Sequence, residues 1–137
     1  MAVDLQIWKT VLKQVVGAIA DEDLQRRAWF GVGPEDSTPD EDICQFFGNA
    51  AIEEFLDRPD TGLNRVQLEP GRRLVKLIRQ LSDEMPDHIK PDDLIDDPRW
   101  REIRKAATRF HKLMWILNSF DIVDSAAPPK LVKCGPA

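Results

Sequence analysis

The sequence predicts an all-α fold, as a single-domain bundle of about five helices with irregular or orthogonal packing. Apolar residues recur at steps of three and four along several segments, and strand-like alternation is absent. Residues that start and stop helices stand at the ends of these segments. A chain of 137 residues, 42% of them hydrophobic, is long enough to bury one core. We expect residues 1–120 to form a helical domain and residues 121–137 a flexible C-terminal tail.

Two helices are expected at the N-terminal end. Residues 4–20 place one apolar stripe on a helix, formed by Leu5, Trp8, Leu12, Val15 and Ile19. Residues 21–30 begin with three carboxylates, which suit the positive end of a helix dipole. Gly31 and Gly33 are stop signals, so residues 31–38 are interpreted as a loop.

Residues 38–57 are expected to form one continuous helix. Thr38 is placed to cap it, Pro39 suits the first helical position, and Glu41 completes a Thr-x-x-Glu capping box. Its buried face is expected to hold Cys44, Phe47, Ala51, Ile52, Phe55 and Leu56, with Ile43 and Phe46 outside that face.

The C-terminal half predicts a loop, a helix, a short turn and a final helix. Residues 58–69 contain Pro and Gly with little periodicity, which is typical of a loop. Residues 70–84 repeat apolar residues at helical spacing, and a short turn is expected around residues 92–94. Asp97 caps a helix with Pro98 at its first position. That helix carries the most regular stripe, formed by Trp100, Ile103, Ala107, Phe110, Met114 and Leu117.

Composition excludes several classes of protein. No apolar run is long enough to span a bilayer, and the first nine residues lack the basic segment of a secretory signal. Cys44 and Cys134 are far apart and lack metal-ligand spacing, which argues against a disulfide scaffold or a zinc site. We therefore expect a cytoplasmic binding protein rather than an enzyme, without a cofactor.

Charge is distributed unevenly along the chain. Residues 1–60 hold thirteen Asp or Glu against five Lys or Arg, whereas residues 98–137 hold three against eight. A negative surface steers a basic protein towards it and raises the association rate. We therefore expect a protein-binding module of the immunity-protein or antitoxin type, which inhibits a basic toxin or nuclease. The expected surface combines carboxylates with two aromatic anchors: Asp21, Glu22, Asp23, Trp29, Phe30, Glu35, Asp36, Asp40, Glu41 and Asp42.

A magnesium-dependent nucleotide phosphohydrolase is the first alternative. Glu53, Glu54 and Asp57 form a Glu-x-x-Asp pattern, and this spacing resembles that of the all-helical nucleotide pyrophosphohydrolases. Asp92, Asp93 and Asp96 form an Asp-Asp-x-x-Asp pattern, which resembles the metal motif of the helical prenyl-diphosphate synthases. Both resemblances imply carboxylates that hold Mg²⁺.

A helical nucleic-acid-binding regulator is the second alternative. Basic residues recur on the outer sides of two predicted helices, at Arg72, Lys76, Arg101, Arg104, Lys105 and Lys112. The overall acidity of the chain, whose net charge is −5, and the lack of Tyr do not favour nucleic acid as a partner. No membrane partner is expected, and a homo-oligomer remains open.

Overall fold

A computed structural model of the chain describes residues 4–85 and 88–117, with side chains up to residue 114. Every regular element within these residues is a helix, so the all-α prediction is confirmed. The elements are α1 (Leu5–Ala20), α2 (Glu22–Ala28), α3 (Pro39–Phe47), α4 (Ile52–Asp57), α5 (Arg65–Glu84), α6 (Pro91–Leu94) and α7 (Pro98–Leu117). The tail predicted for residues 121–137 lies outside the described residues.

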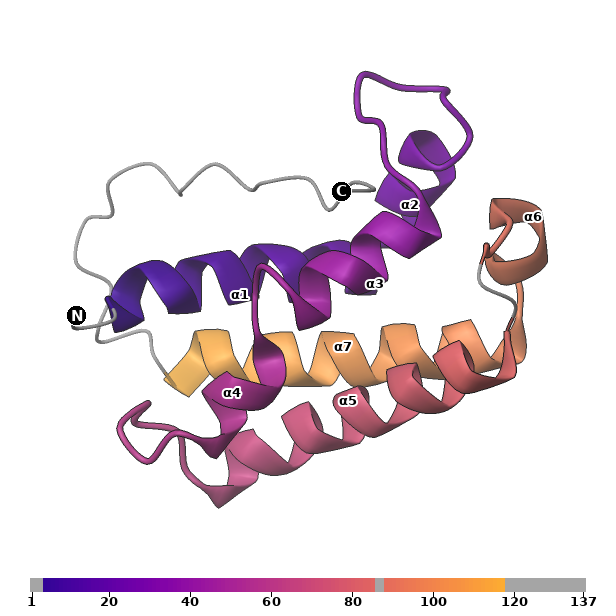
Figure 1. Cartoon of the computed structure of the whole chain (residues 1–137). Helices are drawn as coiled ribbons and strands as arrows, with labels where there is room; N and C mark the ends of the chain where they lie inside the picture. The colour runs from indigo at the N-terminus through magenta and orange to yellow at the C-terminus, as the bar shows by residue number, and fades with distance from the viewer. Residues whose placement is uncertain (1–3, 86–87, 118–137) are drawn as a thin grey trace.

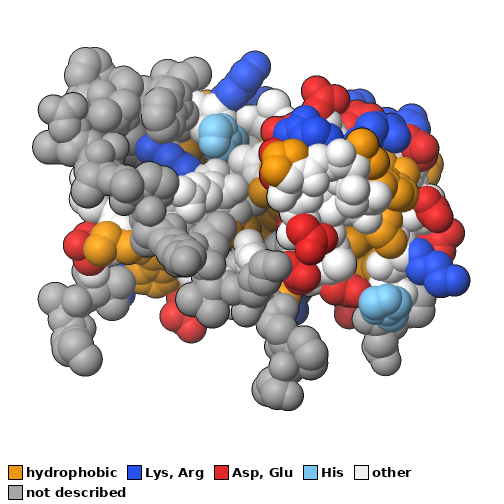
Figure 2. Space-filling model, turned by 90° about the horizontal axis from the view of Figure 1, so that it is seen from above, with side chains coloured by type: hydrophobic (Ala, Val, Ile, Leu, Met, Phe, Trp, Pro, Cys, Tyr) orange, Lys and Arg blue, Asp and Glu red, His pale blue; other side chains and the backbone are white. Residues whose placement is uncertain are grey.

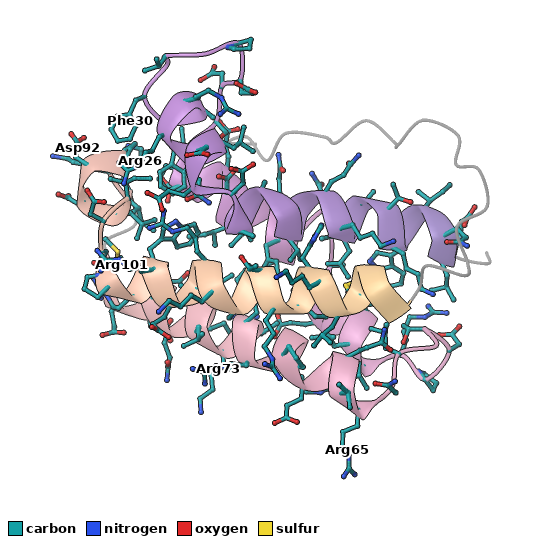
Figure 3. The ribbon with its side chains drawn as sticks, turned by 180° about the vertical axis from the view of Figure 1, so that it is seen from behind. Arg26, Phe30, Arg65, Arg73, Asp92 and Arg101 are labelled. Atoms are coloured by element: carbon teal, nitrogen blue, oxygen red, sulfur yellow. The ribbon has the colours of Figure 1, made fainter. Side chains whose placement is uncertain are left out.

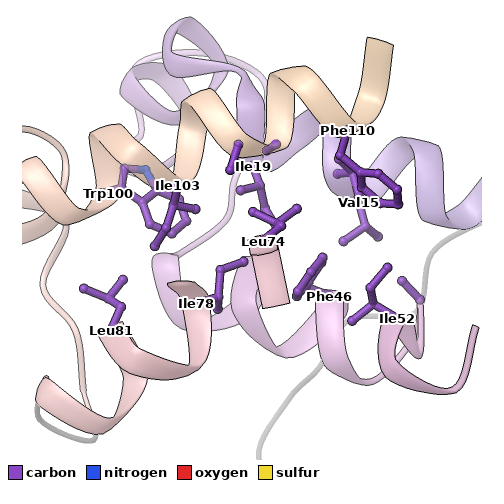
Figure 4. Close-up of a cluster of buried hydrophobic side chains, with 14 of the residues drawn as sticks. Val15, Ile19, Phe46, Ile52, Leu74, Ile78, Leu81, Trp100, Ile103 and Phe110 are labelled. Carbon is purple, nitrogen blue, oxygen red and sulfur yellow. The ribbon is translucent and has the colours of Figure 1, made fainter. Parts of the chain in front are cut away.

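Helix α7 is the centre of the bundle (Figure 1). It lies between α1 and α5 and runs antiparallel to both, while α3 covers α1. Its predicted stripe is confirmed as far as Met114, because Trp100, Ile103, Ala107, Phe110 and Met114 are all buried, while the side chain of Leu117 lies outside those described. Figure 4 shows this stripe meeting side chains from α1, α3, α4 and α5, namely Val15, Ile19, Phe46, Ile52, Leu74, Ile78 and Leu81.

The single helix predicted for residues 38–57 is wrong, because the chain breaks it into α3 and α4. Thr38 caps α3 as predicted, since its hydroxyl accepts a hydrogen bond from the Glu41 backbone N–H at 3.1 Å. Gly48 ends α3, and Ala51 adopts the left-handed conformation with φ +44°. A left-handed residue turns the chain out of a right-handed helix, and α4 then restarts in another direction.

This break also corrects the predicted buried face. Phe46 is fully buried and Phe47 is half-buried, whereas Cys44 lies on the exposed side of α3 and is not a free thiol. Ile52, Phe55 and Leu56 are buried as expected. Once the helix is interrupted, the phase of the apolar pattern in its first part no longer follows from that in the second.

Helix α5 begins earlier than predicted. Asn64 and Gln67 form a capping box: the Asn64 side chain accepts from the Gln67 N–H at 3.0 Å, and the Gln67 side chain accepts from the Asn64 N–H at 2.9 Å. Pro70 therefore lies inside the helix, as its sixth residue, rather than at its first position. Asp97 caps α7 as predicted, with its carboxylate accepting from the Arg99 N–H at 2.8 Å.

Candidate functional site

A loop of residues 29–38 stands out from one end of the bundle (Figure 1). It connects α2 to α3 and carries two exposed hydrophobic side chains, Phe30 at 40% and Val32 at 76% exposure. Gly31 lies between them in the left-handed conformation, with φ +67°. Apolar side chains held in water at a projecting loop are typical of a contact surface for another protein.

The predicted carboxylates of α2 are exposed, and they differ in their partners. Asp21 caps α2 by accepting a hydrogen bond from the Leu24 N–H at 3.0 Å. Glu22 is paired with Arg26 at 2.7 Å and with Arg104 at 3.1 Å. These cations hold the pKa of Glu22 below its usual value. Asp23 is exposed, with no ion pair to any residue in the described part of the chain.

Trp29 and Asp42 do not belong to the surface. Both are buried, and the Trp29 indole Nε1 donates a hydrogen bond to Asp42 Oδ2 at 2.8 Å. Burial raises the pKa of Asp42 to about 6, and the indole hydrogen bond opposes this rise. Trp29 is 7% exposed and Asp42 9%, so they offer a partner little contact area, and the expectation that they form part of the contact surface is corrected.

Instead, Trp29 belongs to a chain of buried polar contacts that ties the loop to the bundle. Its ring packs on Trp100 of α7, with centroids 5.6 Å apart. The Trp100 Nε1 donates to Gln25 Oε1 at 3.0 Å, and Gln25 Nε2 donates to the carbonyls of Ala18 and Ile19 at 2.9 and 2.8 Å. The loop is thereby attached to α1, α2, α3 and α7 at once. No sequence spacing predicts this, because Gln25 and Trp100 are 75 residues apart.

The remaining predicted residues lie around the loop. Glu35 is half-buried and pairs with Arg27 at 3.3 Å, while Asp36 is exposed. Asp40 is half-buried and lies 3.2 Å from His88 Nδ1. Glu41 is half-buried in the first turn of α3.

Helix α6 adds acidic residues to the same end of the bundle. Arg26 of α2 bonds to Asp96 at 2.9 Å, so α6 is held beside α2. Figure 3 shows Asp92, Arg26 and Phe30 at this end. Figure 2 looks onto the molecule from above, where acidic and hydrophobic side chains stand together among a few basic ones. We call this surface the acidic end and define it by Phe30, Val32, Asp23, Asp36, Asp40, Glu41, Asp92 and Asp93.

The carboxylates of the magnesium alternative are not brought together. Glu53, Glu54 and Asp57 lie on α4, whereas the Asp92 to Asp96 group lies on and after α6, at the other end of the bundle (Figure 1). Arg79 holds the Glu53 carboxylate in a bidentate pair, and Arg72 pairs with Asp57 at 3.2 Å. Among the residues described, no group of three or more His, Cys, Asp or Glu could hold a metal ion.

The cations of the nucleic-acid alternative converge on one side of the bundle, and all of them except Arg104 are exposed. Those of α5 and α7 are exposed and line two neighbouring grooves. Arg104 is instead buried, and its guanidinium bonds to the Ile95 carbonyl at 2.9 Å and to Glu22. Sequence reasoning did not include Arg73 and Arg109, which line the groove between α5 and α7.

Comparisons with known proteins do not assign a function to the site, so we interpret it from its own geometry. No protein-family model, no curated protein and no solved structure matches this chain. Within the described residues, no helix has both the length and the apolar character needed to cross a membrane.

Proposed function

We propose that this protein is a binding module whose acidic end receives a basic protein, in the manner of an immunity protein or antitoxin that inhibits a toxin or nuclease. The observation that carries the proposal is the exposure of Phe30 and Val32 on a loop bordered by carboxylates. Apolar anchors supply the surface area that loses its water on binding. The surrounding charges determine which charge the partner must carry and how it is oriented.

The charge around the anchors favours a basic partner. Asp23, Asp36, Asp92 and Asp93 are all exposed, and none has an ion pair to a described residue. Carboxylates without cations of their own produce a negative potential that reaches into solvent and is screened by salt. The buried contacts of Trp29 hold the loop in place before binding, which lowers the entropy lost on association.

The proposal is tested by capture on the immobilised domain from an extract of the cells that make it. We expect the wild type to retain a basic protein that is released as salt rises. Asp23→Lys with Asp36→Lys should abolish retention, and so should Phe30→Ala with Val32→Ala. Glu54→Lys with Asp83→Lys makes the same charge change away from the acidic end and should keep the partner. Equal retention by all variants would contradict the proposal.

A further inference from the structure

The exposed cations of α5 and α7 form one continuous surface beside the acidic end. Along α7, Arg101, Lys105 and Arg109 follow each other at intervals of four residues, so they share one side of the helix. Helix α5 packs directly alongside and adds its own cations. We call this surface the basic face and define it by Arg72, Arg73, Lys76, Arg101, Lys105, Arg109 and Lys112.

Two grooves flank a ridge on this face. The groove between α5 and α7 has a volume of about 830 Å³ and is lined by Arg73 and Lys76 from α5. The groove on the other side of α7 has a volume of about 710 Å³ and is lined by Arg101 and Lys112. Lys105 and Arg109 line both grooves and therefore form the ridge between them.

Most of these cations are available to an external anion. Arg72 pairs with Asp57, and Lys105 lies 3.7 Å from Glu102. Arg73, Lys76, Arg101, Arg109 and Lys112 have no ion pair with any residue that the structure describes. Within the described part of the chain, three carboxylates line the two grooves, Glu22, Glu69 and Glu102. The face therefore keeps a strong positive potential in a chain whose net charge is −5.

We propose that the basic face binds the phosphate backbone of duplex nucleic acid. From Arg101 to Lys112, α7 extends about 16 Å, and helix axes lie about 8–10 Å apart, so the cations cover an area that meets several phosphates. Among the residues whose side chains the structure describes, none that lines either groove is aromatic. Single-strand binding relies on aromatic stacking platforms, so this surface suits a stacked duplex contacted at its phosphates.

This surface is independent of the proposed protein-binding function. Its defining residues lie on α5 and α7, and none of them belongs to the acidic end. Arg73 and Arg109 are exposed, so their replacement leaves the core intact.

The experiment measures binding of a fluorescent 20-base-pair DNA duplex of mixed sequence by anisotropy across a salt series. We expect the wild type to bind at low salt and to weaken steeply as salt rises. Arg73→Glu with Arg109→Glu should weaken binding at least tenfold and flatten the log–log salt slope by about two. Lys9→Glu with Lys90→Glu gives the same net charge change elsewhere and should keep the wild-type slope.

Four results would overturn the proposal. The first is that the wild type does not bind the duplex at 50 mM salt. The second is that both double variants lose affinity equally, which would mean that only the net charge of the protein matters. Alternatively, a poly-glutamate peptide displaces the duplex at equal charge concentration, which would assign the face to an acidic protein. A matching single strand that binds more tightly than the duplex would likewise contradict it.

Discussion

Folding removes the carboxyl group of Asp42 from water, and this changes its acidity. Its pKa rises from 3.8 to about 6, mainly through burial. Between these two values the folded protein holds a proton that the unfolded chain has lost. The contribution of the group to stability is therefore complete below about pH 4 and is lost as pH rises through 6.

Asp42→Asn should stabilise the protein at neutral pH. The amide stays uncharged, and its oxygen can still accept the Trp29 N–H, so the variant avoids burying a charge. We expect its free energy of unfolding to exceed that of the wild type by up to about 3 kcal/mol at pH 8 and to converge with it below pH 4. Urea unfolding at each pH measures the difference. A difference that stays constant with pH would contradict the assignment.

Replacing either of two helical glycines with alanine should change the stability of the protein, and the two changes should differ in direction. A Cβ atom at Gly71 of α5 would lie 2.9 Å from Leu56 Cδ2 and 3.0 Å from two ring carbons of Phe110. Overpacking of this kind costs about 1–3 kcal/mol. Replacing glycine with alanine in a helix gains about 1 kcal/mol at most, so the overpacking cost is the larger of the two.

A Cβ atom at Gly17 of α1 meets only the His111 ring, at 3.4 Å. Gly17→Ala should therefore be neutral or stabilising, and Gly71→Ala destabilising, in thermal unfolding followed by circular dichroism. If Gly71→Ala raised the melting temperature, the close packing of α4, α5 and α7 at this point would be wrong.

At the scale of the element, the junction between α3 and α4 concentrates backbone strain in one residue. Ala51 is the non-glycine residue with positive φ among those described, at φ +44° and ψ 52°. A left-handed alanine costs about 1–2 kcal/mol relative to a right-handed one, and glycine avoids this cost. Ala51→Gly should therefore raise the free energy of unfolding by about 0.5–1 kcal/mol.

The control for this change is the same substitution inside a helix. Ala18 lies in α1, where glycine costs about 1 kcal/mol. Denaturant unfolding of the two variants should thus move the midpoint in opposite directions. A loss of stability in both would show that Ala51 is not strained.

The sequence predicted several helix ends that neighbouring residues decide, missed one such end, and missed the contacts between distant residues. Thr38 and Asp97 cap helices through their own neighbours, so their patterns are readable. The break between α3 and α4 lets the two helices pack on different neighbours, α1 and α5, and helical periodicity alone did not indicate it. The early start of α5 was readable from Asn64 and Gln67, but the nearby Pro and Gly suggested a loop.

Some residues of the candidate surface could likewise be predicted from the sequence, and others could not. The exposure of the carboxylates of α2 and the following loop could be predicted from residue type alone, since charged residues are rarely buried. Asp42 and Trp29 are exceptions because each satisfies the other's hydrogen bond inside the fold. The approach of α6 to α2 rests on the contact between Arg26 and Asp96, 70 residues apart, and no local spacing indicates it.

At the scale of the whole molecule, α7 joins the N-terminal helices to α5 within one hydrophobic core. Near its start, Trp100 contacts Gln25 of α2 and Trp29, and further along the helix Phe110 packs against Gly71 of α5. The acidic end and the basic face are both built on this helix or attached to it. Their relative positions therefore depend on a single cooperative core.

A variant that shortens a buried side chain of the central helix should still unfold as one cooperative unit, at lower stability. Phe110→Ala removes a fully buried ring, and we expect it to lower the free energy of unfolding by about 3–5 kcal/mol. Phe30→Ala removes a ring that is 40% exposed and should change stability by less than about 1 kcal/mol. Because α7 packs against both α1 and α5, helical circular dichroism and tryptophan fluorescence should give coincident transitions for Phe110→Ala. Separate transitions would mean that the α1 side and the α5 side unfold independently, and the two surfaces would then not share one rigid support.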